Sequence, residues 1–237
     1  MIPWLSDEPV FPPLAAALTE PNGLLAAGGD LAPQRILAAY RRGIFPWYSA
    51  EQPILWWSPD PRMVLFPDEL KISRSLAKVL RNQAYDVRLD ANFAAVIAAC
   101  ANTPRDGQPG TWITIEMRAA YRRLHELGHA HSVEVWMDGQ LAGGLYGMAI
   151  GRAFYGESMF SLRRDASKIA IAHLCEQLKR LEFGIIDCQM ETSHLASLGA
   201  RPIPRSDFVA WLDRLTNTNI APGPWPVDAV RDAYRIR

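Results

Sequence analysis

The stretch FYGESMFSLRRDASKIAIAHLCEQLKRLEFGIIDCQ, residues 154–189, decides the fold of this 237-residue chain. Its pattern of apolar residues predicts a strand over 154–160, an amphipathic helix over 166–182 and a second strand over 185–190. Asp165 stands where it would cap the start of that helix. We expect the rest of the chain to frame this strand–helix–strand unit.

Both predicted strands carry polar residues where a buried strand should carry none. The four residues are Glu157, Ser158, Asp187 and Gln189. Burying such groups without partners is costly, so their presence on two neighbouring core strands indicates a site. Asp187 and Gln189 are separated by one residue, and the alternation of a strand predicts that they share one face. The alternative interpretation is that they only tie the strand to a neighbouring loop.

The elements outside this unit follow an α+β order. A meander of three strands is expected over 132–137, 140–150 and 153–160, with a strong hairpin signal at Asp138-Gly139. The other expected elements are helices at 33–42, from about 73, at 92–100, at 115–127 with Thr114 as its cap, at 193–198 and at 207–215, and strands at 62–66, 85–89 and 200–204. This order is similar to the acyltransferase fold of the N-acetyltransferases that use acetyl-CoA (the GNAT type), with a mixed, mostly antiparallel sheet flanked by helices.

A segment rich in proline and aromatic residues, GIFPWYSAEQPILWWSPDPR at 43–62, cannot hold regular structure for long. It is predicted to close a small N-terminal domain over 1–62. The GNAT-type domain then occupies 63–237.

Composition excludes several classes of protein. The 25 basic and 25 acidic residues cancel, so no global field indicates a nucleic-acid or membrane partner. The N-terminus does not resemble a signal peptide, and no apolar run is long enough to span a membrane. Three cysteines without a CxxC pair indicate reduced thiols in a cytoplasmic protein.

One local basic face remains, in KISRSLAKVLRN at 71–82. Lys71, Arg74, Lys78 and Arg81 recur at spacings of three and four, which places them on one helix face. The face is either simply solvated or a contact for the phosphate backbone of a nucleic acid.

Three motifs suggest other chemistry. HELGH at 125–129 matches a zinc-protease pattern, but Gly128 is expected to end the helix and separate the two imidazoles, so we predict no metal site. The turn SLRRDAS at 161–167 lacks the glycines that cradle a coenzyme pyrophosphate, which opposes acetyl-CoA as a substrate. Cys188 should point away from Asp187 and pack in the core rather than act as a nucleophile.

Nine motifs, in order along the chain, resemble one family. They are GGDL (28–31), YRRGIFPWY (40–48), WWSPDPR (56–62), GTWIT (110–114), HELGHAHSVEVW (125–136), FYGESMFS (154–161), ASK (166–168), IDCQ (186–189) and HLASLGA (194–200). The chain resembles the leucyl/phenylalanyl-tRNA–protein transferases from about residue 20 to 210. The resemblance implies transfer of Leu, Phe or Met from aminoacyl-tRNA to the α-amine of proteins that begin with Arg or Lys, which marks them for N-end-rule degradation. It also implies an enzyme without metal or coenzyme. We expect the enzyme to be a monomer.

The resemblance implies three groups of site residues. The catalytic candidates are Asp187, Gln189 and Glu157; the substrate pocket is implied at Trp47, Trp112, Met148, Phe154, Met159, Ile171 and Ile186; and the tRNA-binding helix is implied at Arg74, Lys78 and Arg81. We hypothesise that Asp187 polarises Gln189, whose carbonyl oxygen accepts a hydrogen bond from the attacking amine. Glu157 would instead hold a cationic group of the substrate. An acetyl-CoA-dependent N-acetyltransferase and a non-catalytic RNA-binding module remain the alternative functions.

Overall fold

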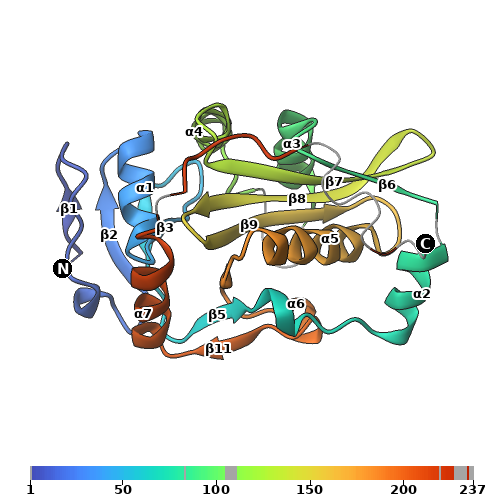
Figure 1. Cartoon of the computed structure of the whole chain (residues 1–237). Coiled ribbons are helices and arrows are strands. Elements are labelled where there is room, and N and C mark those ends of the chain that lie inside the picture. Colours follow the sequence, from blue (N-terminus) through green and yellow to red (C-terminus); the bar gives the residue numbers. More distant parts are fainter. Residues whose placement is uncertain (1, 83, 105–110, 219, 227–233, 235–237) are drawn as a thin grey trace.

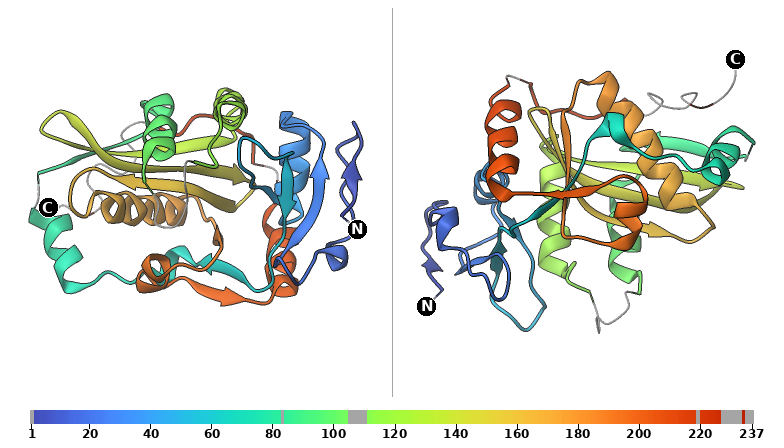
Figure 2. Two further views of the ribbon diagram at one scale, coloured as in Figure 1. Left: turned by 180° about the vertical axis from the view of Figure 1, so that it is seen from behind. Right: turned by 90° about the horizontal axis from the view of Figure 1, so that it is seen from below.

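The computed structural model describes residues 2–82, 84–104, 111–218, 220–226 and 234, and these form two sheets. The smaller sheet lies at one end of the molecule and the larger sheet fills its centre (Figures 1 and 2). Most of the loop predicted over 102–112 lies outside the described residues.

The smaller sheet has the strand order β1-β2-β4-β3. Its strands are short: β1 is Trp4–Leu5, β2 is Leu24–Gly28, β3 is Phe45–Pro46 and β4 is Leu55–Trp57. Helix α1 (Pro33–Arg41) follows β2 and begins with a proline, whose missing N–H costs nothing in the first turn. The change from one sheet to the other falls between Trp57 and the next strand, and the domain division at residue 62 stays a prediction.

The larger sheet has the order β11-β5-β10-β9-β8-β7-β6. Its strands are β5 (Arg62–Leu65), β6 (Asp86–Leu89), β7 (Ala130–Met137), β8 (Gln140–Ile150), β9 (Ala153–Ser161), β10 (Ile185–Gln189) and β11 (Arg201–Ile203). Among the described strands of this sheet, β9 and β10 are the one parallel pair. The predicted α+β class with a mixed, mostly antiparallel sheet is therefore confirmed.

Helices cover both faces of this sheet (Figure 1). The helices that follow α1 along the chain are α2 (Arg74–Asn82), α3 (Phe93–Asn102), α4 (Ile115–Glu126), α5 (Ala166–Arg180), α6 (Ser193–Ser197) and α7 (Arg205–Leu215). Two apolar cores result. The α4-side core joins α3 and α4 to α1 and the smaller sheet, and the α5-side core packs α5 and α2 on the other face. Because α1 shares a core with α4, the small sheet is fixed against the large one.

Local sequence signals explain most element boundaries. The Thr114 hydroxyl accepts a hydrogen bond from the Met117 N–H at 3.2 Å, so the predicted cap is confirmed. Asp138 and Gly139 both have positive φ, as a two-residue hairpin between β7 and β8 requires. The predicted Asp165 cap was wrong, because Asp165 adopts a left-handed conformation and its carboxylate accepts from Lys168 Nζ instead.

Two bulges break the alternation of the central strands. On β9, Gly156 pairs with Gly147 and Ser158 with Tyr146, so Glu157 is an extra residue against β8. On β10, Asp187 and Gln189 oppose successive residues of β5, so the residue between them is extra. A bulge bends its strand and re-aims the side chains near it. Both bulges lie just beyond the end of the parallel β9–β10 pairing, so the two strands separate where the polar residues stand.

Close packing at Gly147 should make this position intolerant of any side chain. A Cβ atom there would collide with the Tyr155 carbonyl oxygen and would lie 2.6 Å from the ring of the buried Phe154. We expect Gly147→Ala to lower the free energy of unfolding by about 1–3 kcal/mol through overpacking, measured by urea denaturation. Gly156→Ala is the matched control, since its nearest contact would be 3.5 Å away. Equal stabilities of the two variants would contradict this packing.

Candidate active site

A cavity of about 290 Å³ opens where β9 and β10 separate. It is lined by Phe45, Trp47, Trp112, Leu145, Tyr146, Phe154, Gly156, Glu157, Ser158, Met159, Ile171, Leu174, Ile186, Cys188, Gln189, Met190, Thr192, His194 and Leu195. Residues of both cores contribute, so the cavity crosses the plane of the sheet. Its wall is mostly apolar with a few polar groups, which is typical of a small-molecule site.

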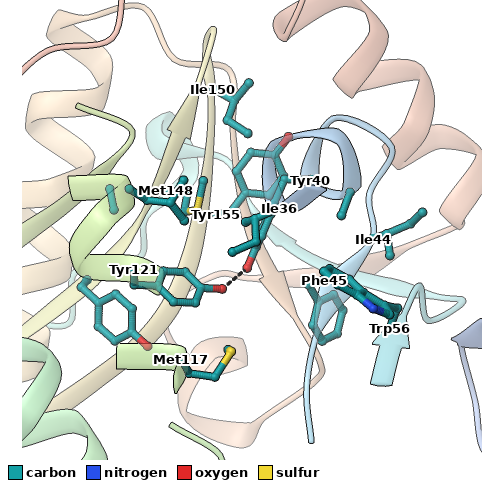
Figure 3. Packing of buried hydrophobic residues seen from close by; sticks show 14 of the residues in the cluster. Ile36, Tyr40, Ile44, Phe45, Trp56, Met117, Tyr121, Met148, Ile150 and Tyr155 are labelled. Atoms are coloured by element: carbon teal, nitrogen blue, oxygen red, sulfur yellow. Dashed lines mark hydrogen bonds between the residues drawn. The ribbon is translucent and has the colours of Figure 1, made fainter. Parts of the chain in front are cut away.

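Six of the seven residues implied for the substrate pocket come together in this wall. Trp47, Trp112, Phe154, Met159, Ile171 and Ile186 all line the cavity, although they come from β9, α5, β10 and the segments after β3 and before α4. Met148 does not. It is fully buried in the α4-side core near Tyr121 (Figure 3) and is not among the residues that line the cavity.

Sequence reasoning missed several residues of the wall. Leu174 stands one helical turn after Ile171 on α5, so helical spacing from the predicted residue would have found it. Phe45 lies inside the motif YRRGIFPWY, and His194 and Leu195 begin the motif HLASLGA. No local pattern separates these from ordinary core residues.

Asp187 and Gln189 do not share a strand face, because the bulge between them breaks the alternation. Gln189 adopts a left-handed conformation with φ of 61° and lines the cavity. Its Nε2 lies 3.4 Å from Glu157 Oε1, to which it donates. Asp187 is 1% exposed and is not part of the cavity wall. The prediction of a shared face was therefore wrong.

The Asp187 carboxylate is bound instead by Arg62. Arg62 Nε donates to Oδ1 at 2.8 Å and Nη2 donates to Oδ2 at 2.7 Å, and both side chains are almost fully buried. The guanidinium also lies within 4.8 Å of the ring centres of Phe45 and Phe208. This bidentate pair explains how a carboxylate is tolerated in the core.

Asp187 also holds the bulge. Its Oδ1 accepts from the Gln189 backbone N–H at 2.9 Å. Within the described residues, the contact between these two is to the backbone of Gln189 and not to its side-chain amide. The observed geometry thus assigns Asp187 to fixing the backbone from which Gln189 enters the cavity.

Glu157 is the charged residue of the wall, and it is only 8% exposed. Tyr40 Oη donates to its Oε1 at 2.6 Å and Tyr121 Oη donates to its Oε2 at 3.0 Å. The pKa of Glu157 is raised to about 7: burial is the largest cause of the rise, the hydrogen bonds from the two tyrosines oppose it, and the nearby Asp187 charge adds to it. At neutral pH the protonated and the ionised forms of this carboxyl group are therefore both populated.

Cys188 packs against the α5-side core, as predicted, and also lines the cavity. Burial, followed by the charge of Asp187, raises the pKa of the Cys188 thiol far above its usual range. A thiol that stays protonated is a poor nucleophile. The expectation that Cys188 is not a nucleophile therefore has a physical basis.

The HELGH pattern folds as the sequence indicates. Helix α4 ends at Glu126, and Gly128 has a φ of 78°. The His125 ring stacks on Phe93 and its Nδ1 lies 2.8 Å from the Ala130 carbonyl oxygen. Within the part of the chain that the structure describes, no group of three His, Cys, Asp or Glu side chains is placed to hold a metal ion.

The predicted basic helix is formed as α2. Leu76 and Leu80 are buried against the α5-side core, while Arg74, Lys78 and Arg81 are exposed. None of these three exposed cations forms an ion pair with another described residue. Their charges are therefore available to a partner.

Two family models match the chain. The model described as leucyl/phenylalanyl-tRNA protein transferase covers residues 64–213, and the model of the N-terminal domain of the same proteins covers residues 29–60. Among similar proteins, one of Chromobacterium violaceum is 66% identical over 90% of this chain and 91% of its own length. One of Aromatoleum aromaticum is 61% identical over 99% of both chains. Both are described as leucyl/phenylalanyl-tRNA–protein transferases.

Similar solved structures include a GCN5-related N-acetyltransferase from Kribbella flavida. It is 13% identical, covers 72% of this chain and 60% of that chain, and has a TM-score of 0.38. A likeness at this level says nothing about activity. Among the described helices, none is both long enough and apolar enough to cross a lipid bilayer.

Proposed function

The chain belongs to the leucyl/phenylalanyl-tRNA–protein transferase family, and we propose that it moves Leu, Phe or Met from aminoacyl-tRNA to proteins that begin with Arg or Lys. It is thus an aminoacyltransferase whose substrates are an aminoacyl-tRNA and a protein. In this proposal, the modified N-terminus marks the acceptor protein for N-end-rule degradation. The observation that supports it most is the apolar cavity with Glu157 and Gln189 in its wall.

The size and lining of the cavity suit an aliphatic or aromatic side chain. Met159 and Phe154 adapt easily to a flexible guest that is unbranched at Cβ, such as Leu, Phe or Met. Side chains that branch at Cβ would collide with the wall close to the backbone. Discrimination between apolar side chains is limited to about 1–3 kcal/mol per methylene, so some leakage toward other apolar residues is expected.

The reaction itself needs little more than orientation. An aminoacyl ester is already activated, and holding two reactants together is a large effect. The attacking α-amine has a pKa of about 8, so a fraction of it is neutral at pH 7. Because Gln189 Nε2 donates to Glu157, the carbonyl oxygen of Gln189 is left to accept a hydrogen bond from that amine.

The exposed cations of α2 would bind the phosphates of the tRNA. Arg74, Lys78 and Arg81 lie on one face of the helix, and phosphate contacts of this kind supply affinity without reading sequence. The acetyl-CoA alternative is not favoured, since the family match concerns transfer from tRNA and the turn at 161–167 lacks glycine.

Transfer of radiolabelled leucine from Leu-tRNA to a peptide that begins with Arg tests the proposal. We expect label in this peptide, and none in a matched peptide that begins with Glu or in the Arg peptide with an acetylated N-terminus. Acetyl-CoA in place of Leu-tRNA should give no product. Transfer to the Arg peptide no faster than without enzyme would contradict the proposed function.

A further inference from the structure

Three side chains from separate parts of the chain meet beside the cavity. Tyr40 comes from α1, Tyr121 from α4 and Glu157 from β9. Besides their bonds to the carboxylate, the hydroxyl oxygens of Tyr40 and Tyr121 lie 2.5 Å apart, as the dashed line in Figure 3 shows. The contacts Tyr40–Glu157, Glu157–Tyr121 and Tyr121–Tyr40 therefore close a ring, which we call the Tyr–Tyr–Glu ring.

The two charge states of this ring differ in the hydrogen bonds that they can make. Each of its three contacts needs one proton. The two phenols supply two, because an ionised carboxylate only accepts. A protonated Glu157 supplies the third, so that it donates to Tyr121, Tyr121 donates to Tyr40, and Tyr40 donates back to the carboxyl group. The ionised state keeps both bonds to the carboxylate and leaves the Tyr40–Tyr121 contact without a proton.

The surroundings make Glu157 the group that titrates. Burial raises the pKa of both Tyr40 and Tyr121 well above the usual value, so the phenols keep their protons. Burial brings the pKa of Glu157 to about 7. The other groups that face the ring are Tyr146 on β8, and Asp187 on β10 with its partner Arg62 on β5.

We propose that the Tyr–Tyr–Glu ring stores one exchangeable proton at the cavity wall, and that Tyr40 and Tyr121 are positioning residues that hold the Glu157 carboxyl for proton exchange with the substrates. This inference rests on the proposed function, because the exchange serves the transfer step. In this proposal the N-terminal segment contributes to the active site, because helix α1 supplies Tyr40, one of the two phenols.

The transfer step then conserves protons. The neutral α-amine attacks the carbonyl carbon of the aminoacyl ester, and the new C–N bond forms. The ionised Glu157 takes the proton that the amine nitrogen must lose. As the C–O bond to the ribose breaks, Glu157 returns this proton to the departing ribose oxygen. The ring ends the cycle in the charge state in which it began.

Infrared difference spectra of the free protein test the stored proton directly. A protonated-carboxyl C=O band should appear as the pH falls through about 7. It should be absent in Glu157→Gln, because the amide Nε2 can replace the protonated oxygen in the ring and does not titrate. This isosteric variant should also slow single-turnover transfer by about 10²-fold, the usual effect of losing a general acid–base group.

The positioning role is tested with Tyr40→Phe and Tyr121→Phe. Each change removes one of the two charge-assisted hydrogen bonds that stabilise the ionised carboxylate and lower the pKa of Glu157, so the midpoint of the carboxyl band should rise by about one pH unit. The low-pH limb of the transfer rate should move by the same amount, because the ionised form is the base. Tyr155→Phe is the matched control: its ring packs on Tyr40 at 5.0 Å, yet its buried hydroxyl has no partner among the described residues.

The outcomes separate this inference from the proposed function. A carboxyl band with a midpoint near 7 that both tyrosine variants raise, and that Tyr155→Phe leaves unchanged, supports the ring. A wild-type spectrum without a Glu157 band between pH 6 and 8, or tyrosine variants with the wild-type midpoint and pH profile, would overturn it. Failure of wild-type leucine transfer would instead count against the proposed function, since the spectra need no substrate.

Discussion

Replacing Arg62 with methionine should lower the free energy of unfolding by about 3–5 kcal/mol. The guanidinium is fully buried and is bound at both ends of the Asp187 carboxylate. Its removal leaves a buried carboxylate whose one remaining partner among the described residues is the Gln189 backbone N–H. An uncompensated charge in the core is among the few single changes that cost this much. Urea denaturation followed by circular dichroism measures the loss.

A double variant distinguishes the cost of a stranded charge from the loss of packing. Arg62→Met combined with Asp187→Leu removes both charges and should recover most of the lost stability, because apolar residues often replace buried ion pairs without penalty. Arg123→Met is the control, since its ion pair with Glu126 is more than half exposed, and it should change stability by less than about 0.5 kcal/mol. A double variant no more stable than Arg62→Met would show that packing around the guanidinium, and not its charge, decides the effect.

The same double variant should remain slow in leucine transfer. Asp187 anchors the Gln189 N–H at the bulge, and leucine cannot accept that hydrogen bond. The contribution of Asp187 to activity stays a prediction. Its carboxylate contacts the backbone N–H of Gln189 among the described residues, so we expect it to act by fixing this backbone turn and not by polarising the side-chain amide.

The candidate site could be located from sequence because polar residues on buried strands are unusual. Glu157 and Gln189 were identified in this way, and both line the cavity. Their geometry could not be predicted. A bulge inserts one residue into a strand without any change in the apolar pattern, so simple alternation placed Asp187 and Gln189 on the same face.

The hydrogen-bonding partners of the buried carboxylates could not be predicted from local patterns for a different reason. Arg62 is 125 positions from Asp187 along the chain, and Tyr40 is 117 positions from Glu157. Periodicity, caps and turns report on neighbours within about one turn or one strand. Which buried cation or phenol meets which carboxylate is decided by how the sheets pack.

The strands of the small sheet could not be predicted from local patterns either. Strands β3 and β4 are two and three residues long, so they offer no alternation to detect in a segment full of proline. Their order comes from packing: Trp56 is fully buried and its indole N–H donates to the Gly28 carbonyl oxygen at 2.9 Å. Phe45 and Trp47, which line the cavity, are held by this sheet.

Replacing Arg74, Lys78 and Arg81 together by alanine should weaken tRNA binding by about 10²-fold at physiological salt. Each phosphate contact contributes about 0.9 to the slope of log K against log salt, so three contacts change the slope by about 2.7. These side chains are exposed, while the buried face of α2 is held by Leu76 and Leu80. The variant should therefore keep its fold and its unfolding midpoint. Filter binding of Leu-tRNA at several salt concentrations measures both quantities.

The control must remove the same charge from another face. Arg118, Arg122 and Arg123 lie on α4, which covers the opposite face of the sheet from α5 and α2 (Figure 1). Their joint replacement by alanine changes the net charge equally and should leave the slope nearly unchanged. The two triple variants distinguish the two interpretations of the basic face. If the face is simply solvated, both variants should change tRNA binding little and equally. If it is a docking face, only the α2 variant should reduce the slope of log K against log salt. An unaltered slope in the α2 variant would mean that the tRNA binds elsewhere on the protein.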